Sequence, residues 1–202
     1  MDTTHSFADG QQYTGETFRK RALPDGELSG IDWTDCTFDG CVFTGNHFAR
    51  CAFTGCRFTG CDLSLMQPRH TTFQDTYFTD CKLVGVDWTL TRGRAEVKFP
   101  LGVGFTRCIL DYAAFFGLSL AGVTFADCTA RETDFREANL TGAKLCGMDC
   151  TGALFHHTNL TRADLTDAHD YTIDPTANTI TRAIFSLPDA LALLAGFDIV
   201  IT

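Results

Sequence analysis

The sequence predicts an all-β solenoid, a rod made of small coils stacked on one another. Two observations predict it: a large apolar residue recurs at every fifth position over most of the chain, and a small residue usually stands two positions before it. A period of five is neither the period of two of a strand nor the period of about 3.6 of a helix. The repeating unit is therefore one short extended segment followed by one corner.

The central residues of a first series run through the N-terminal half. They are Tyr13, Phe18, Leu23, Leu28, Trp33, Phe38, Phe43, Phe48, Phe53, Phe58, Leu63, Phe73, Phe78, Leu83 and Trp88. Positions i and i−2 of an extended segment share a face, so the central residue and the small residue before it both point into the coil. The two remaining residues, often Thr-Gly or Asp-Gly, form the corner. Pro68 takes one central position without changing the phase, which predicts a local distortion.

A second series of central residues follows an insertion. Its members are Phe105, Leu110, Phe115, Leu120, Phe125, Ala130, Phe135, Leu140, Leu145, Cys150, Phe155, Leu160 and Leu165. It starts 17 positions after the last member of the first series, three repeats plus two, so we expect a kink or loop within residues 89–104. The insertion contains Arg92, Arg94 and Lys98, which we expect to contact a binding partner. A tolerated insertion on the surface of a solenoid is the alternative.

The cysteines follow the same repeat. Eight of the ten occupy the small position: Cys36, Cys41, Cys51, Cys56, Cys61, Cys81, Cys108 and Cys128. A repeated Cys-x4-Cys spacing without matching histidines is not a zinc pattern, so we expect free thiols that fill the core. The N-terminus shows no basic and apolar leader, and no run of about 18 apolar residues occurs. These features predict a soluble cytoplasmic protein without membrane contact.

The C-terminal residues depart from the repeat. We expect one β-helical unit over residues 1–185 and a cap over residues 186–202, in which Pro188 suits the start of a helix and Gly196 its end. The following "FDIVIT" predicts a short apolar strand. An exposed patch is expected at Leu187, Leu191, Leu194, Phe197, Ile199 and Ile201. The open end of a solenoid needs covering; a cap alone is one solution, and a homodimer through the C-terminus is the one we favour.

The chain is acidic, most strongly in its second half. Its 16 Lys and Arg stand against 25 Asp and Glu, a net charge of −9, and residues 105–202 carry 12 acids against 6 bases. Direct nucleic-acid binding would need a cationic surface, so a basic partner is favoured instead. Eight acids fall at outward positions and are available to such a partner: Asp111, Asp127, Glu132, Asp134, Glu137, Asp149, Asp164 and Asp167. A solubilising surface is the alternative.

Sequence patterns of catalysis are missing. A filled solenoid offers no pocket for convergent side chains, and the chain contains no phosphate loop, nucleophile elbow or HExxH motif. His156 and His157 are adjacent, so we expect them to point in different directions at the surface and not to bind a metal. The sequence therefore predicts a binding protein that is not an enzyme and uses no cofactor or metal.

The segments "REANLTGAKL" and "TRADLTDA" resemble the A(N/D)LxxA pattern of the pentapeptide-repeat family, and the resemblance extends over residues 11 to about 185. It implies a right-handed quadrilateral β-helix with four pentapeptides per coil. The segments "CDLSLMQPRHTTF", "CKLVGVDWT" and "ARETDFREANL", with the C-terminal residues, are similar to the topoisomerase-poison resistance subfamily that includes Qnr, MfpA and AlbG. The middle and C-terminal segments resemble the albicidin-resistance protein AlbG most.

This resemblance implies a function. A member of the subfamily is expected to bind DNA gyrase, through GyrA, or topoisomerase IV, and to protect the enzyme from poisons such as quinolones or albicidin. The outward acids of a C-terminally joined homodimer would then mimic DNA in the saddle that the enzyme offers to the duplex. The alternative is a pentapeptide-repeat scaffold with an unrelated protein partner.

Overall fold

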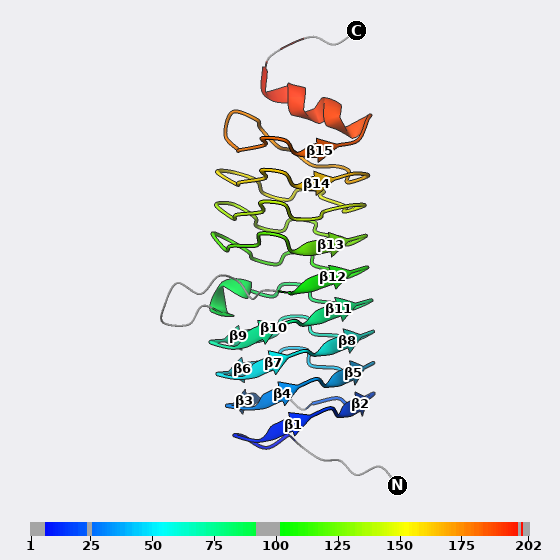
Figure 1. Ribbon diagram of the computed structural model, residues 1–202, viewed down its shortest axis with the longest axis vertical. Coiled ribbons are helices and arrows are strands. Elements are labelled where there is room, and N and C mark those ends of the chain that lie inside the picture. Colours follow the sequence, from blue (N-terminus) through cyan, green and yellow to red (C-terminus); the bar gives the residue numbers. More distant parts are fainter. Residues whose placement is uncertain (1–6, 24–25, 92–101, 198, 200–202) are drawn as a thin grey trace.

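The protein is an elongated stack of about eight coils in the computed structural model, which describes residues 7–23, 26–91, 102–197 and 199 (Figure 1). Most strands have only three residues, because one pentapeptide supplies one side of a coil and the corner after it. The strands of the N-terminal half are β1 (Gln12–Thr14), β2 (Thr17–Arg19), β3 (Glu27–Ser29), β4 (Asp32–Thr34), β5 (Thr37–Asp39), β6 (His47–Ala49), β7 (Ala52–Thr54), β8 (Arg57–Thr59), β9 (Gln67–Arg69), β10 (Thr72–Gln74) and β11 (Tyr77–Thr79).

The second half contains fewer assigned strands and two short helices. Its elements are η1 (Trp88–Thr91), β12 (Gly104–Thr106), β13 (Thr124–Ala126), β14 (Asp164–Leu165), β15 (Ile184–Phe185) and η2 (Asp189–Phe197). Between the strands, isolated parallel bridges such as Asn139 to Asn159 continue the sides of the rod.

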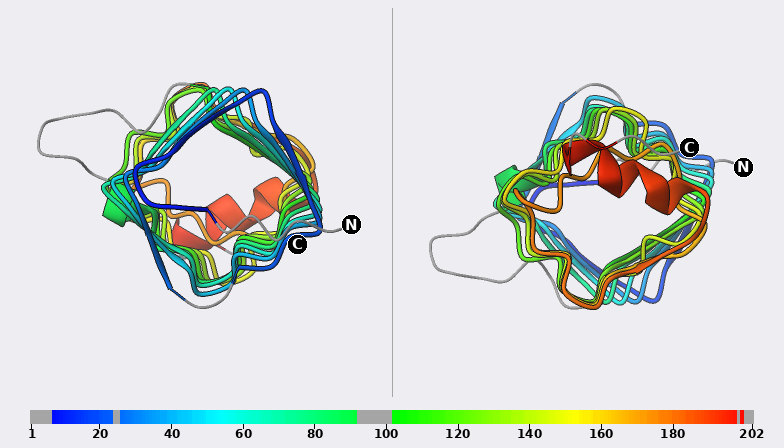
Figure 2. Two further views of the ribbon diagram at one scale, coloured as in Figure 1. Left: turned by 90° about the horizontal axis from the view of Figure 1, so that it is seen from below. Right: turned by 90° about the horizontal axis from the view of Figure 1, so that it is seen from above.

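Four pentapeptides make one coil. Parallel strands pair 20 positions apart, as Tyr13 does with Trp33 and Phe18 with Phe38. The sheets have the strand orders β1-β4-β7-β10, β13-β12-β11-β8-β5-β2 and β3-β6-β9, with β14-β15 as a further pair. Figure 2 shows the four-sided outline that results when the rod is viewed along its axis. The expected quadrilateral β-helix is confirmed.

Central side chains fill the interior and stack from coil to coil. The rings of Trp33 and Phe53 have centroids 4.5 Å apart, as do those of Phe38 and Phe58. These distances follow from the spacing of neighbouring strands, about 4.8 Å. Full burial of one such side chain contributes roughly 1.5–3 kcal/mol. A single coil cannot bury its rings alone, so the stack is the stable unit.

Where it is Cys or Thr, the small residue two positions before a central residue also donates a hydrogen bond to a backbone carbonyl. The Sγ of Cys61 lies 3.4 Å from the carbonyl oxygen of Phe38, and the Oγ1 of Thr76 donates to the carbonyl of Phe53 at 3.1 Å. Both donors follow their acceptors by 23 positions, so the bond joins two successive coils. Cys and Thr are both small and both carry a donor, which explains why they share this position.

The thiols give a direct test of the closed core. All ten cysteines are free, and only Cys146 is partly exposed, because its position after Leu145 points outward. Burial raises the pKa of Cys56 to about 12, which suppresses its thiolate. We expect DTNB to label Cys146 alone in the native protein and all ten thiols after unfolding in guanidinium. A Cys146→Ser variant should lose the native signal, and rapid labelling of several thiols in that variant would contradict the closed core.

Corner residues take a left-handed backbone conformation and point to solvent. The second residue after a centre has a positive φ, +60° at Gly40, +53° at Asp35 and +52° at Asp127. This conformation suits Gly and is tolerated by Asp and Asn, while other side chains cost about 1 kcal/mol there. The corners therefore display charged residues along the edges of the rod.

The predicted distortion is absent at Pro68 itself. Pro68 is the buried centre of β9, and it lies in register opposite Phe48 of β6. Its ring fills a central position like any other apolar side chain. Proline has no N–H to donate to the next coil, and in keeping with this the side continues beyond β9 with η1 and not with a strand.

The insertion adds seven residues to one coil. Phe78 pairs with Phe58 at the usual spacing of 20 but with Phe105 at a spacing of 27. Residues 92–101, which hold most of the insertion, lie outside the described part of the chain. On either side of them, Trp88 and Phe105 are both fully buried, with ring centroids 5.5 Å apart. The core is therefore continuous past the insertion.

The repeat becomes irregular before the C-terminal helix. Asp170 falls where the next central residue would be expected, five positions after Leu165, but it is exposed with a φ of +56°. Tyr171 and Ile173 are buried instead. β15 then pairs with β14 to close a last coil, and η2 lies across that coil (Figure 2). The expected helix is thus present. The described helices are all too short or too polar to cross a membrane.

The expected C-terminal strand falls mainly on residues 198 and 200–202, which lie outside the described residues, and its first residue is helical. Phe197, its first predicted residue, is the last residue of η2, and Ile199 belongs to no strand. The helix therefore continues past Gly196. Leu193 packs against the core from η2, so helical contacts with the last coil decide the conformation of this segment.

Candidate interaction surface

Three acids surround the coil formed by residues 123–142, here called the acidic coil. Asp127, Glu132 and Glu137 occupy three successive corners, with φ values of +52°, +52° and +58°. All three side chains are exposed. Within the described residues, no hydrogen-bond donor or ion-pair partner contacts their carboxylates. The corner geometry therefore displays three negative charges without a direct ion pair on three edges of the rod.

Two arginines beside these acids form their ion pairs with other carboxylates. Arg131 donates from Nε to Oδ2 of Asp149 at 2.8 Å, and its Nη2 lies 2.7 Å from the same oxygen. Arg136 forms a two-point pair with Asp134, at 2.9 Å from Nε and 2.8 Å from Nη2. Because each guanidinium is held by another carboxylate, Glu132, which follows Arg131, stays without a cation.

Asp149 is not the exposed acid that was expected. Its side chain is only 12% exposed and lies beneath Arg131. Burial alone would raise the pKa of Asp149, but hydrogen bonds from Thr151 and from Arg131 outweigh burial and lower the pKa to about 2. Asp149 thus occupies an outward position, but Arg131 of the neighbouring coil covers most of its side chain. Asp149 stabilises the rod and is a poor contact for a partner.

Acid titration should reveal this role. The pKa of Asp149 is lower in the folded state than its usual 3.8, so its contribution is present above that pH and is lost as the pH falls towards about 2. We expect Asp149→Asn to lose about 2 kcal/mol of unfolding free energy at pH 7 and little at a pH below 2. Urea unfolding at both pH values measures this. Glu132→Gln, which removes an unpaired charge, should change stability by less than about 0.5 kcal/mol.

The other expected acids divide between bound and free. Asp111 accepts from the hydroxyl of Thr129 at 2.7 Å, and Asp164 accepts from the hydroxyl of Thr166 at 2.6 Å. Both are half-buried. Asp167 is exposed at a corner two coils above Asp127. The structure therefore leaves Asp127, Glu132, Glu137 and Asp167 as the acids with free carboxylates among the eight.

One side of the rod carries no acid among its described residues in this half. The outward residues on the side centred on Leu120, Leu140 and Leu160 include Ser119, Asn139, Asn159, Thr141 and Thr161, and none of the described residues of this side is acidic. The acids lie on the other three sides and their corners. Negative potential is therefore distributed asymmetrically around the rod.

Several expected residues lie elsewhere. Arg92, Arg94 and Lys98 fall outside the described residues. His156 and His157 are exposed, as expected, but their rings do not diverge: the centroids are 4.0 Å apart. The left-handed corner at His157 turns its side chain back beside its neighbour.

The C-terminal end is apolar and exposed. Leu187 is 78% exposed, and Leu191, Phe197 and Ile199 are also exposed. Leu194 is half-buried, and Ile201 lies outside the described residues. Ile184, on β15 beside this cap, adds a further exposed side chain that the repeat pattern did not single out. Together these residues leave an apolar surface at the end of the rod.

One group of possible metal ligands is present among the described residues. Asp149, His169 and Asp170 each place a donor atom within 4.8 Å of the others. The guanidinium of Arg131 already neutralises Asp149, and His169 Nδ1 lies 2.8 Å from Oδ2 of Asp170. A cation there would have to displace a guanidinium, so this group does not fit a metal.

Known sequence families match both halves of the rod. The pattern described as a pentapeptide repeat region matches residues 31–99, and the pattern described as pentapeptide repeats (8 copies) matches residues 108–145 and 133–169. No curated protein matches the sequence.

Solved structures share the architecture. A trypsin-treated variant of QnrB1, described as a plasmid-mediated fluoroquinolone resistance protein, is similar with a TM-score of 0.63 at 18% identity, over 96% of this chain and 99% of that one. HetL, a pentapeptide repeat protein involved in heterocyst differentiation regulation from the cyanobacterium Nostoc, is similar with a TM-score of 0.51 at 20% identity, over 87% and 85%. At these identities the likeness concerns the fold. With both halves matched and the 20-residue register observed, the chain belongs to the pentapeptide-repeat family.

Proposed function

We propose that the protein binds DNA gyrase or topoisomerase IV as a non-catalytic homodimer and protects the enzyme from topoisomerase poisons. The observation that carries the proposal is the acidic coil, whose three corner carboxylates form no hydrogen bond or ion pair with the described residues. A rod with negative charge on several edges complements a concave basic surface, such as the saddle that holds duplex DNA. The fold similarity to QnrB1, itself a fluoroquinolone resistance protein, supports the choice of target.

Dimerisation through the C-terminus would bring the two acidic halves together. In each protomer, residues 105–202 carry a net charge of −6. Joining the C-terminal ends of two protomers would therefore concentrate negative charge at the middle of a longer rod. The exposed side chains of Leu187, Leu191 and Phe197 supply apolar area for this contact. The proposed site on the enzyme is the GyrA dimer, or its counterpart in topoisomerase IV.

A supercoiling assay tests the function. Gyrase holoenzyme, relaxed plasmid and either a quinolone or an albicidin-type poison are combined with increasing amounts of the purified protein. We expect supercoiling to recover and cleaved plasmid to decrease in at least one of the two arms. If the cleaved fraction stays unchanged at every concentration in both arms, and the same holds for topoisomerase IV, the protein does not protect these enzymes.

The dimer is tested separately. We expect Leu187→Asp combined with Leu191→Asp to convert a dimer into a monomer in light scattering after size-exclusion chromatography, because two charges cannot be buried in an apolar contact. Leu65→Asp is the control, since Leu65 is also exposed, at 59%, but lies far from the C-terminal end. A monomeric wild-type protein would contradict this part of the proposal.

A scaffold function is the second candidate. HetL shares the fold and is described as acting in the regulation of differentiation, so the fold alone does not select a topoisomerase. A scaffold predicts no change in either supercoiling assay and a stable complex with an unrelated protein.

A further inference from the structure

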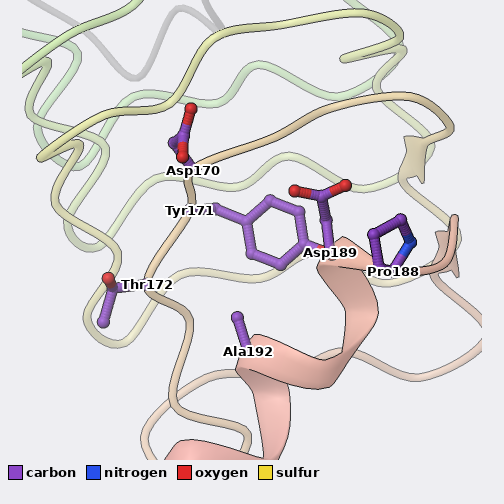
Figure 3. A pocket seen from close by; sticks show the side chains of 6 residues that line it. All are labelled: Asp170, Tyr171, Thr172, Pro188, Asp189 and Ala192. Atoms are coloured by element: carbon purple, nitrogen blue, oxygen red, sulfur yellow. The ribbon is translucent and has the colours of Figure 1, made fainter.

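A pocket lies where the last coil meets η2. It is lined by Asp170, Tyr171, Thr172, Pro188, Asp189 and Ala192, with a cavity volume of about 440 Å³. Figure 3 shows the ring of Tyr171 reaching from the last coil towards the start of η2, with Asp170 and Asp189 on either side. This volume lies within the range of small-ligand sites, about 300–1,000 Å³. The repeat pattern gave no sign of this pocket, because it forms where the repeat becomes irregular.

The hydroxyl of Tyr171 lacks a partner. Tyr171 is 3% exposed, and its hydroxyl is closed to solvent without a hydrogen bond from the described residues. A buried hydroxyl left without a bond costs about 1–3 kcal/mol. Burial and the charge of Asp189 raise the pKa of Tyr171 to about 12, which keeps the hydroxyl neutral. Because this hydroxyl is closed to solvent, Tyr171 lines the pocket with its ring.

The charges of the pocket have one sign. Asp170 and Asp189 both line it, and no Lys or Arg does. The side chain of Asp170 is 64% exposed, and its carboxylate lies 2.8 Å from the imidazole of His169. The carboxylate of Asp189 has no hydrogen bond or ion pair within the described residues. The apolar part of the wall comes from Tyr171, Pro188 and Ala192.

We infer that this pocket binds an organic cation, an alkylammonium or alkylguanidinium group. Asp189 and Asp170 supply the negative charge, and the Tyr171 ring with Pro188 packs against the alkyl stem. An aromatic ring beside two carboxylates is the arrangement that recognises such groups. The group can belong to a free amine or to a Lys or Arg side chain of another protein. The inference is independent of the proposed topoisomerase function.

The test uses the full-length, 15N-labelled protein and two probes. The first is butylguanidinium chloride, and the second is a short capped peptide with one central arginine; butanol serves as the uncharged control. We expect saturable shifts of the backbone amides of Asp170, Tyr171 and Asp189 with either cation and none with butanol. Saturation by the free cation alone indicates a small-molecule site, and tighter binding of the peptide indicates a protein side chain; both support an organic-cation pocket.

Variants separate the pocket from general acidity. We expect Asp189→Asn to weaken binding by about fivefold or more, and Tyr171→Phe, which keeps the ring, to bind like the wild type. Asp167→Asn removes an exposed carboxylate from a nearby corner and should bind like the wild type. Binding that persists equally in Asp189→Asn, the absence of saturation, or the same shifts induced more tightly by Mg²⁺ or Ca²⁺ would overturn the inference. The melting temperature and the supercoiling rescue of Asp189→Asn are measured as controls. If both are unchanged, weaker cation binding by this variant reflects the pocket alone, and neither the fold nor the proposed function is affected.

Discussion

Replacing Phe105 by alanine is expected to destabilise the protein by about 3–5 kcal/mol, the usual cost of deleting a buried aromatic side chain. Phe105 is fully buried and stacks on Phe78 and Phe125, with both centroid distances 5.2 Å. It also meets the edge of Trp88 at 5.5 Å. These contacts join the two halves of the core past the insertion. Each coil of a solenoid contacts only its neighbours. A cavity at Phe105 therefore weakens the contact between the two halves, and no other coil supplies a substitute contact.

Urea unfolding followed by far-ultraviolet circular dichroism, which reports on both halves, measures this effect. Tyr112→Ala is the control, since Tyr112 lies in the same coil but is 63% exposed, and we expect a change within about 0.5 kcal/mol. We also expect Phe105→Ala to separate unfolding into two transitions, one for each half. A loss similar to that of Tyr112→Ala would mean that Phe105 does not connect the halves.

Neutralising the acidic coil should weaken binding to the topoisomerase. The triple variant Asp127→Asn, Glu132→Gln, Glu137→Gln removes three unpaired charges without removing a hydrogen bond of the described structure. We expect its Kd for GyrA to rise about tenfold at low ionic strength and by less at high ionic strength, where salt screens exposed charges. Fluorescence anisotropy with a labelled protein measures both values.

A matched variant distinguishes position from total charge. Glu16→Gln, Glu27→Gln, Asp35→Asn removes three exposed acids from the N-terminal coils, and Asp35 shares with Asp127 a corner conformation with φ near +53°. We expect this variant to bind GyrA within about twofold of the wild type. Equal weakening by the two triple variants would show that only net charge matters and that the acidic coil is not a specific contact.

The period of five was sufficient to predict the coil interior. Phe53 and Phe58 lie inside and the cysteines are free, because burial of one large and one small side chain per side leaves little freedom in the register. The number of sides did not follow from the period. It came from the family resemblance and is now visible in the 20-residue pairing of Tyr13 with Trp33.

The surface was predicted less well than the core. Position within the repeat separates inward from outward residues, but it does not tell which outward acid meets an arginine of the next coil. Arg131 and Asp149 are 18 positions apart, a diagonal contact that can be inferred only once the coil length is known. The pocket at Tyr171 and the helix through Phe197 depend on contacts between η2 and an irregular coil, for which no repeat exists.

Competition between this protein and duplex DNA on GyrA tests the central claim most directly. A fluorescent duplex is bound to the GyrA dimer, and unlabelled protein is added while anisotropy is followed. If the acidic rod occupies the DNA saddle, the duplex is released completely, with a midpoint that rises in proportion to the DNA concentration. A ternary complex, seen as anisotropy that stays high or increases while the protein binds, would contradict the account.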